Sequence, residues 1–311
     1  MSTVRGSTAM GEAEPSESRF ITVDGTRLRY LDRGSGAPVL LLHGNGSMIE
    51  DFVASGIMDD APHHRFVAFD RPGFGHSERP AGRSWGPFEQ ASLLLNALAH
   101  LEIERPIIVG HSWGALVALA MALQSAEQVA GLVLMAGYYY PTPRTEAIRV
   151  PAAAFPFVRR LMASDTMRRV FAPCTVPERF KRTYPMPLAM RMSQMRTVDE
   201  EAAMLLGAAK TLCQFYGKLS VPVRLIAGSH DRIVDTDQHS LRLHLDLASS
   251  TFTRLPGVGH MVHHAAPKEV LQAIATVGAH QSGKGGRPAS DADDQRPTRQ
   301  WLHIGGDLVA A

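Results

Sequence analysis

Short apolar runs recur along this chain, and several of them end in glycine-rich turns. Two alternating stretches on either side of Asp24-Gly25 predict an antiparallel hairpin. The continuous apolar runs predict buried strands, because a strand in a parallel sheet is covered on both faces. The eight predicted strands span residues 20–23, 27–31, 38–42, 65–69, 107–109, 130–135, 222–227 and 251–255.

Helical patterns lie between these runs, at residues 87–101, after Ser112, and at 236–247 and 267–277. Strands that alternate with helices predict the α/β class, with a mostly parallel sheet covered on both faces. Ligands of such sheets gather at the carboxyl ends of the strands. The glycine-rich turns follow these ends, so the candidate chemistry converges on one edge of the sheet.

The alternation of strands and helices stops between residues 138 and 217, where prolines interrupt short helical stretches. Residues 138–198 hold eleven Lys and Arg but three Asp and Glu. We expect residues 138–217 to form a helical cap, inserted between the core segments 20–137 and 218–280. Residues 1–19 and 281–311 are polar and rich in small residues, and we expect them to be largely disordered tails.

The pattern Gly110-x-Ser112-x-Gly114 stands between a predicted strand and a predicted helix. Glycines on both sides of the serine allow a sharp backbone turn and close packing of helix on strand. The serine hydroxyl would then be exposed at a helix N-terminus, where N–H groups stabilise a developing negative charge. Ser112 is therefore the candidate nucleophile.

Composition narrows the range of partners. The 311 residues are 45% hydrophobic, and 32 basic residues against 30 acidic ones give a formal net charge of +2. This balance gives no electrostatic reason to expect nucleic acid or an acidic membrane surface as a partner.

No segment reaches the ~20 apolar residues of a membrane helix. Two cysteines cannot build a disulfide framework, which fits a reducing cytoplasm. We expect a small-molecule substrate; whether the chain forms a homo-oligomer stays open.

Four motifs stand in a fixed order: His43-Gly44-Asn45-Gly46, Asp70-Arg71-Pro72-Gly73-x-Gly75-x-Ser77, Gly110-x-Ser112-x-Gly114 and Gly257-Val258-Gly259-His260. With them the chain resembles the α/β-hydrolase superfamily, and in particular its capped, esterase-like serine hydrolases. The resemblance covers roughly residues 20–279. It implies the α/β-hydrolase fold: a mostly parallel eight-stranded sheet flanked by helices, with the cap inserted after the sixth strand.

The resemblance also implies a catalytic triad of Ser112, Asp231 and His260, in the chain order of this fold. His260 follows a strand and a Gly-x-Gly turn, and it is the candidate base. Asp231 follows the strand at 222–227 and looks like the family's acid. Asp235 is the nearest competitor, but it stands where an aspartate would cap the next helix.

The oxyanion hole of this fold takes the backbone N–H after the nucleophile and one from the loop after the third strand. These are Trp113 and Asn45 here. Phe74, Met162 and Met190 are candidate substrate contacts, with ordinary packing as the alternative. The resemblance implies no cofactor. A metal site at His260-x-x-His263-His264 lacks obvious carboxylate or cysteine partners, so no metal is expected.

The residue at position 112 separates the branches of the superfamily. Haloalkane dehalogenases and epoxide hydrolases resemble this chain but carry aspartate there. Serine favours cleavage of a small carboxylic ester, lactone or thioester through an acyl-enzyme. Carbon–carbon bond hydrolysis and cofactor-free perhydrolysis use the same triad and remain alternatives. The motif that is usual in carbon–carbon hydrolases differs from this chain at Ser47-Met48, and the motif that is usual in perhydrolases differs from it at Trp113. A small-molecule receptor without turnover is the alternative of another class.

Overall fold

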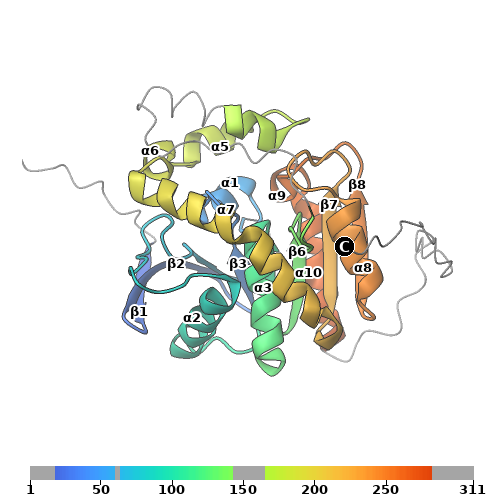
Figure 1. Ribbon diagram of the computed structural model, residues 1–311, viewed down its shortest axis with the longest axis horizontal. Helices are drawn as coiled ribbons and strands as arrows, with labels where there is room; N and C mark the ends of the chain where they lie inside the picture. The colour runs from blue at the N-terminus through green and yellow to red at the C-terminus, as the bar shows by residue number, and fades with distance from the viewer. Residues whose placement is uncertain (1–17, 60–63, 143–164, 282–311) are drawn as a thin grey trace, which may run out of the picture.

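The computed structural model describes residues 18–59, 64–142 and 165–281. Eight strands form one sheet in the order β1-β2-β4-β3-β5-β6-β7-β8 (Figure 1). Strand β2 pairs antiparallel with β1 and β4, and the remaining pairs are parallel. The strands are β1 (Arg19–Val23), β2 (Thr26–Gly34), β3 (Ala37–Leu42), β4 (His64–Phe69), β5 (Ile107–His111), β6 (Gly131–Met135), β7 (Val223–Gly228) and β8 (Ser250–Leu255).

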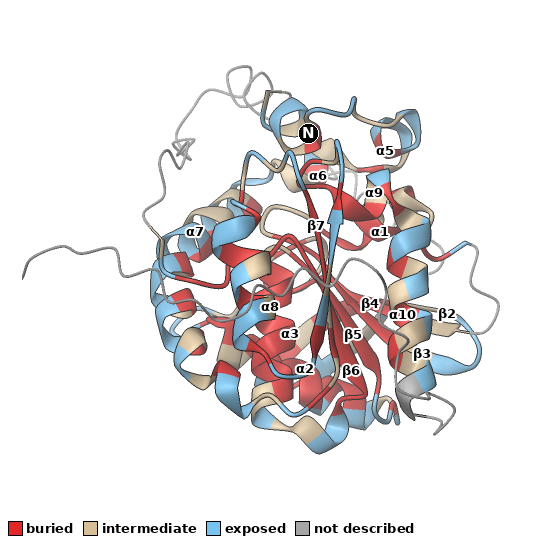
Figure 2. Cartoon of the chain, turned by 90° about the vertical axis from the view of Figure 1, so that its right-hand side faces the viewer, coloured by how far each residue is buried: buried red, intermediate tan, exposed pale blue. Residues whose placement is uncertain are grey.

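Strand side chains point alternately into two apolar cores, one on each face of the sheet. In β3, Leu40 and Leu42 contribute to one core, and Val39 and Leu41 to the other. The first core is covered by α2 (Pro87–His100), α3 (Trp113–Gln124) and α8 (Arg242–Asp246). The second is covered by α1 (Ile49–Ser55), α9 (Val262–Ala265) and α10 (Pro267–Gln281). In Figure 2 the buried residues follow the sheet between these helices.

The chain between β6 and β7 carries the helices α5 (Glu178–Thr183), α6 (Met186–Ala189) and α7 (Met192–Leu212). In Figure 1, α5 and α6 lie above the sheet and α7 descends beside α3. Phe171, Phe180 and Tyr184 form a third apolar cluster with Met48 and Met261 from the core. We call residues 165–218 the insertion; residues 143–164 lie outside the described part of the chain.

The predicted sheet is confirmed, with each strand found within a few residues of its expected bounds. Helix α1 was not predicted, because its seven residues include the buried carboxylate of Asp51 and show no clean apolar stripe. The helix expected at 236–247 begins as a π-helical turn at Asp237–Leu241 and continues as α8. None of the helices in the described ranges combines the length and apolarity needed to cross a membrane.

Candidate active site

Ser112 stands at a strained turn between β5 and α3. Its φ of 53° and ψ of −117° lie outside the regions that side chains favour, a strain of about 1–3 kcal/mol. Glycine is required on both sides. A Cβ at Gly110 would lie 2.6 Å from the Gly114 carbonyl oxygen, and one at Gly114 would lie 2.2 Å from that of Leu42. The tight helix–strand packing therefore fixes the turn that presents the serine.

His260 and Asp231, which the resemblance implies as base and acid, form a hydrogen-bonded pair. The His260 Nδ1 lies 2.8 Å from Asp231 Oδ2, and the two side chains are only 5% and 1% exposed. The other carboxylate oxygen, Oδ1, accepts the N–H groups of Ile233 at 2.8 Å and Val234 at 3.0 Å. A carboxylate at Nδ1 favours the tautomer with the proton there, which leaves Nε2 free to accept a proton.

Asp235 makes the contacts expected of a helix cap. Its Oδ1 accepts the backbone N–H groups of Asp237 at 3.0 Å and Gln238 at 2.8 Å. These bonds lie at the start of the π-helical turn that precedes α8. Of the two aspartates weighed for the acid, Asp231 is therefore the one that contacts the imidazole.

Ser112 Oγ makes no hydrogen bond with any residue in the described ranges, so the serine and His260 are not joined in this structure. The residue before Ser112, His111, does contact His260. The ring of His111 lies 4.8 Å from that of His260, centroid to centroid, and His111 Nε2 donates to the His260 carbonyl oxygen at 3.1 Å. Nucleophile–base contacts are often loose in unliganded enzymes and tighten when substrate binds. The serine–histidine contact stays a prediction.

Trp113 and Asn45 are expected to supply the two amides that stabilise an oxyanion. Trp113 is the first residue of α3, so its N–H has no acceptor within the helix. Gly44, which precedes Asn45, packs against the serine: a Cβ there would lie 3.1 Å from Ser112 Cβ. The Trp113 indole N–H and the Asn45 Oδ1 are also buried without a hydrogen-bond partner among the described residues. Unsatisfied polar atoms beside a nucleophile are suited to contact substrate.

His43 supports the loop that carries Asn45. Its Nδ1 donates to the Gly44 carbonyl oxygen at 2.8 Å, and its Nε2 accepts the Arg71 N–H at 2.9 Å. Complete burial, followed by the positive charge of Arg71, lowers the pKa of His43 well below 6.5. The ring is therefore neutral, with its proton on Nδ1.

The three candidate substrate contacts have different surroundings. Phe74 is fully buried, edge-on to His43 with ring centroids 5.3 Å apart and 4.8 Å from the Arg71 guanidinium, so its observed contacts are packing contacts. Met190 is half-buried at the end of α6. Met162 lies outside the described residues.

A buried carboxylate that no sequence pattern singled out lies close to the His260 loop. Asp51 in α1 accepts a hydrogen bond from Ser47 Oγ at 2.8 Å and lies 2.7 Å from His264 Nε2 and 3.1 Å from His263 Nε2. Burial alone would raise the pKa of Asp51, but the charge of His263 and hydrogen bonds from both histidines lower it well below its usual value.

The sequence showed no carboxylate partner for a metal site at His263 and His264, and Asp51 lies where such a partner would stand. One potential ligand atom from each of the three residues lies within 4.8 Å of the others. The 2.7 Å separation between His264 Nε2 and Asp51 is that of a hydrogen bond, and His263 Nε2 lies 3.1 Å from the same carboxylate, so direct contacts account for the cluster.

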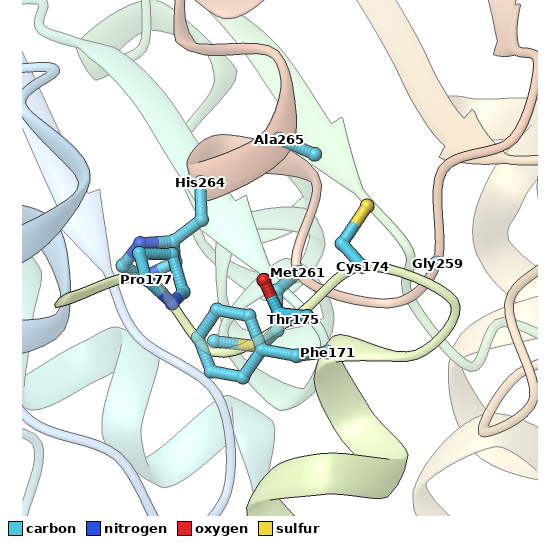
Figure 3. A pocket seen from close by; sticks show the side chains of 8 residues that line it. All are labelled: Phe171, Cys174, Thr175, Pro177, Gly259, Met261, His264 and Ala265. Carbon is cyan, nitrogen blue, oxygen red and sulfur yellow. The ribbon is translucent and has the colours of Figure 1, made fainter. Parts of the chain in front are cut away.

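A cavity of about 50 Å³ opens between the His260 loop and the insertion (Figure 3). Gly259 and Met261 line it from the loop, and Phe171 and Cys174 line it from the insertion. It has room for a few water molecules and is smaller than a typical ligand pocket. Cys174 is an exposed free thiol.

The chain is similar to several known proteins. A family model described as alpha/beta hydrolase fold matches residues 37–267. Haloalkane dehalogenase 2 from Mycobacterium bovis is 27% identical over 280 residues, which cover 84% of this chain and 94% of that protein. A 2-hydroxymuconate semialdehyde hydrolase from Pseudomonas sp. strain CF600 is 34% identical over 153 residues, 48% of this chain and 54% of the relative. The crystal structure of an alpha/beta hydrolase fold protein from Burkholderia ambifaria superposes with a TM-score of 0.71 at 19% identity, covering 86% of this chain and 100% of the other.

Proposed function

The chain belongs to the alpha/beta hydrolase fold family, and we propose that it is a serine hydrolase that cleaves a small carboxylic ester, lactone or thioester. The observation that supports this most strongly is the buried Asp231–His260 pair, whose base contacts the residue next to Ser112. A serine hydroxyl needs such a base, because it is a poor nucleophile until its proton is removed.

The proposed reaction has two halves. Ser112 Oγ attacks the acyl carbon while its proton passes to His260 Nε2, and Asp231 stabilises the imidazolium. The negative charge on the carbonyl oxygen is stabilised by the N–H groups of Asn45 and Trp113, each contributing about 3 kcal/mol. The leaving oxygen or sulfur takes the proton from His260, and an acyl-enzyme remains. Water then gives a proton to His260 and attacks the acyl carbon, and Ser112 recovers its proton as the acid leaves.

Haloalkane dehalogenation does not suit a serine at this position. A carboxylate nucleophile that displaces halide forms an alkyl ester, which water can hydrolyse at the enzyme's own carbonyl carbon. Ser112 would instead form an alkyl ether, which has no carbonyl carbon for water to attack. The similarity to a haloalkane dehalogenase therefore supports membership of the family but not dehalogenation by this chain.

Hydrolysis of a carbon–carbon bond is the second candidate, favoured by the 34% identity to a semialdehyde hydrolase over about half of each chain. The same serine would attack a ketone carbon, the bond from that carbon to its neighbouring carbon would break, and the fragment leaving as a stabilised carbanion would take the proton from His260. The loop Gly44-Asn45-Gly46-Ser47-Met48 differs from the Gly-x-Gly-Pro-Gly that is usual in these enzymes. Ester hydrolysis therefore remains the first candidate.

The insertion is the proposed cap, because α5 and α6 lie above the end of the sheet at which Ser112 and His260 stand (Figure 1). Its residues would form much of the wall around the acyl group and so select the substrate. The proposal also includes a cytoplasmic location, in keeping with the two free cysteines.

The proposal is tested by measuring turnover of p-nitrophenyl acetate and butyrate by wild type and Ser112→Ala. We expect wild-type turnover, reduced in the variant by about 10⁵-fold, to the background rate. Dienone substrates and added peroxide in the same assay identify the carbon–carbon and perhydrolase alternatives. No turnover, combined with thermal stabilisation by one of the small molecules, would contradict the proposal and favour a receptor.

A further inference from the structure

A fully buried arginine supports the loop that carries Asn45. Arg71 follows β4, and its side chain is 0% exposed. Its Nε donates to the His43 carbonyl oxygen at 2.8 Å and its Nη2 to that of Gly44 at 2.9 Å. The Gly44 carbonyl also accepts the His43 Nδ1 proton at 2.8 Å. The Ser47 N–H donates to the same oxygen at 3.3 Å. The carbonyl of the Gly44–Asn45 peptide is thus held by three donors, of which the Arg71 guanidinium is the charged one.

This contact sets the direction of the amide on the same peptide. In a planar trans peptide the N–H points opposite to the C=O. Because the Gly44 carbonyl points toward Arg71, the Asn45 N–H points away from it. Gly44 itself packs against Ser112, as its added Cβ would lie 3.1 Å from the serine Cβ. Arg71 therefore orients the amide that is proposed to bind the oxyanion.

The guanidinium is paired with a carboxylate from the insertion. Glu201 in α7 is 0% exposed; its Oε1 accepts from Arg71 Nη1, and its Oε2 accepts from Nη2 at 3.1 Å. Gln90 accepts from Arg71 Nη1 at 2.9 Å and donates to Glu201 Oε1 at 2.9 Å. All five N–H groups of the guanidinium thus have acceptors. A buried cation is costly without its partner, so the position of Arg71 depends on Glu201.

Helix α7 contacts the Asn45 loop and the turn after β4 from neighbouring positions on one side of the helix. Asn45 Nδ2 donates to the Val198 carbonyl oxygen at 3.1 Å, and the Gly75 N–H donates to Gln194 Oε1 at 3.2 Å. Residues 194, 198 and 201 recur with the spacing of one helix face. The face of α7 that carries Glu201 is therefore the face that touches the Asn45 loop.

We propose that Glu201 is a positioning residue for the oxyanion hole: it holds Arg71 in place, Arg71 fixes the Gly44–Asn45 peptide, and α7 thereby completes the hole. This role rests on the proposed serine hydrolase function. Catalysis then depends on the packing of the insertion against the core. Removal of α7 would leave Arg71 without its counter-charge and the Asn45 amide without its support.

The test compares Glu201→Gln with Glu200→Gln, both full-length. The control removes a neighbouring carboxylate on the same helix, one that pairs with Arg79 and is 56% exposed. Steady-state ester hydrolysis gives kcat and KM. A trifluoromethyl ketone matched to the acyl chain reports on the hole, because its adduct with Ser112 carries an oxyanion. Near-ultraviolet circular dichroism and thermal melting report on folding.

We expect Glu201→Gln to lower kcat by about 10–100-fold and to keep KM within about 3-fold of the wild-type value. The inhibition constant of the ketone should rise by the same factor by which kcat falls. Glu200→Gln should match wild type in all three. If Glu201→Gln does not fold, Arg71→Lys, which keeps the charge and loses the fork of donors, should show the same pattern.

A folded Glu201→Gln with wild-type kcat and ketone affinity would overturn the role of Glu201 and leave the proposed function intact. A change confined to KM or to the melting temperature would do the same. Wild type without Ser112-dependent turnover would overturn the proposed function, and the role of Glu201 would fall with it.

Discussion

Asp231 and Asp235 stand four positions apart, and both use Oδ1 to accept backbone N–H groups. The Oδ2 of Asp231 lies against His260. Asp231→Asn should lower kcat by about 10⁴-fold, because an amide no longer favours the imidazole tautomer that can act as base. Asp235→Asn makes the same chemical change and should leave kcat unaltered, since asparagine also caps helices. Equal losses in the two variants, measured by ester hydrolysis, would contradict these assignments.

Motifs at strand ends were enough to select the candidate residues Ser112, Asp231 and His260 from the sequence. Asp51 and Glu201 could not be selected in that way. Their partners His264 and Arg71 lie 213 and 130 positions away in the chain. A lone carboxylate on a helix is ordinarily solvated, so only the folded chain shows that these two are buried and paired.

At the level of elements, the junction of β5 and α3 depends on glycines that lack space for a side chain. Gly114→Ala should reduce the free energy of unfolding by at least about 2 kcal/mol, because the added Cβ would lie 2.2 Å from the Leu42 carbonyl oxygen. Gly207→Ala is the matched control. Gly207 is an exposed position inside α7 with nothing within 4 Å of an added Cβ, so the change should stabilise by about 0.5–1 kcal/mol. Urea denaturation of both variants checks this; equal effects would contradict it.

Buried strands were predictable because their apolar runs are continuous and bounded by turns. Helix α1 escaped prediction because it is short and its buried face includes Asp51, which breaks the apolar pattern. The π-helical turn before α8 was equally invisible, since a one-residue change in helical hydrogen bonding has no signature in hydrophobic spacing. Tertiary packing, more than local preference, decides both cases.

For the whole molecule, buried neutral histidines make stability depend on pH. Burial lowers the pKa of His43 and of His111 well below 6.5, reinforced by Arg71 for the first and by His263 and His260 for the second. As pH falls below about 6.5 the unfolded chain gains protons that the folded chain does not, so each group removes about 1.4 kcal/mol of stability per pH unit.

The variant His111→Asn should therefore lose less stability than wild type between pH 6.5 and 5, by about 1.4 kcal/mol per unit. Burial raises the pKa of Asp70 to about 6, so this carboxyl group adds stability as the pH falls. Wild type and His111→Asn both keep Asp70, so the difference between their stability–pH slopes reports on His111 alone. His100→Asn, at the exposed end of α2, is the matched control for replacing a histidine by asparagine. Identical slopes for wild type and His111→Asn in urea titrations would contradict the account.

The most direct measurement of the proposed chemistry is the site of covalent reaction with a fluorophosphonate, read by mass spectrometry of proteolytic fragments. We expect a single adduct on Ser112 in wild type, and much slower formation of this adduct in His260→Ala, because the hydroxyl then lacks its base. An unmodified Ser112 after prolonged incubation, or an adduct formed equally fast without His260, would contradict the claim that His260 activates this serine.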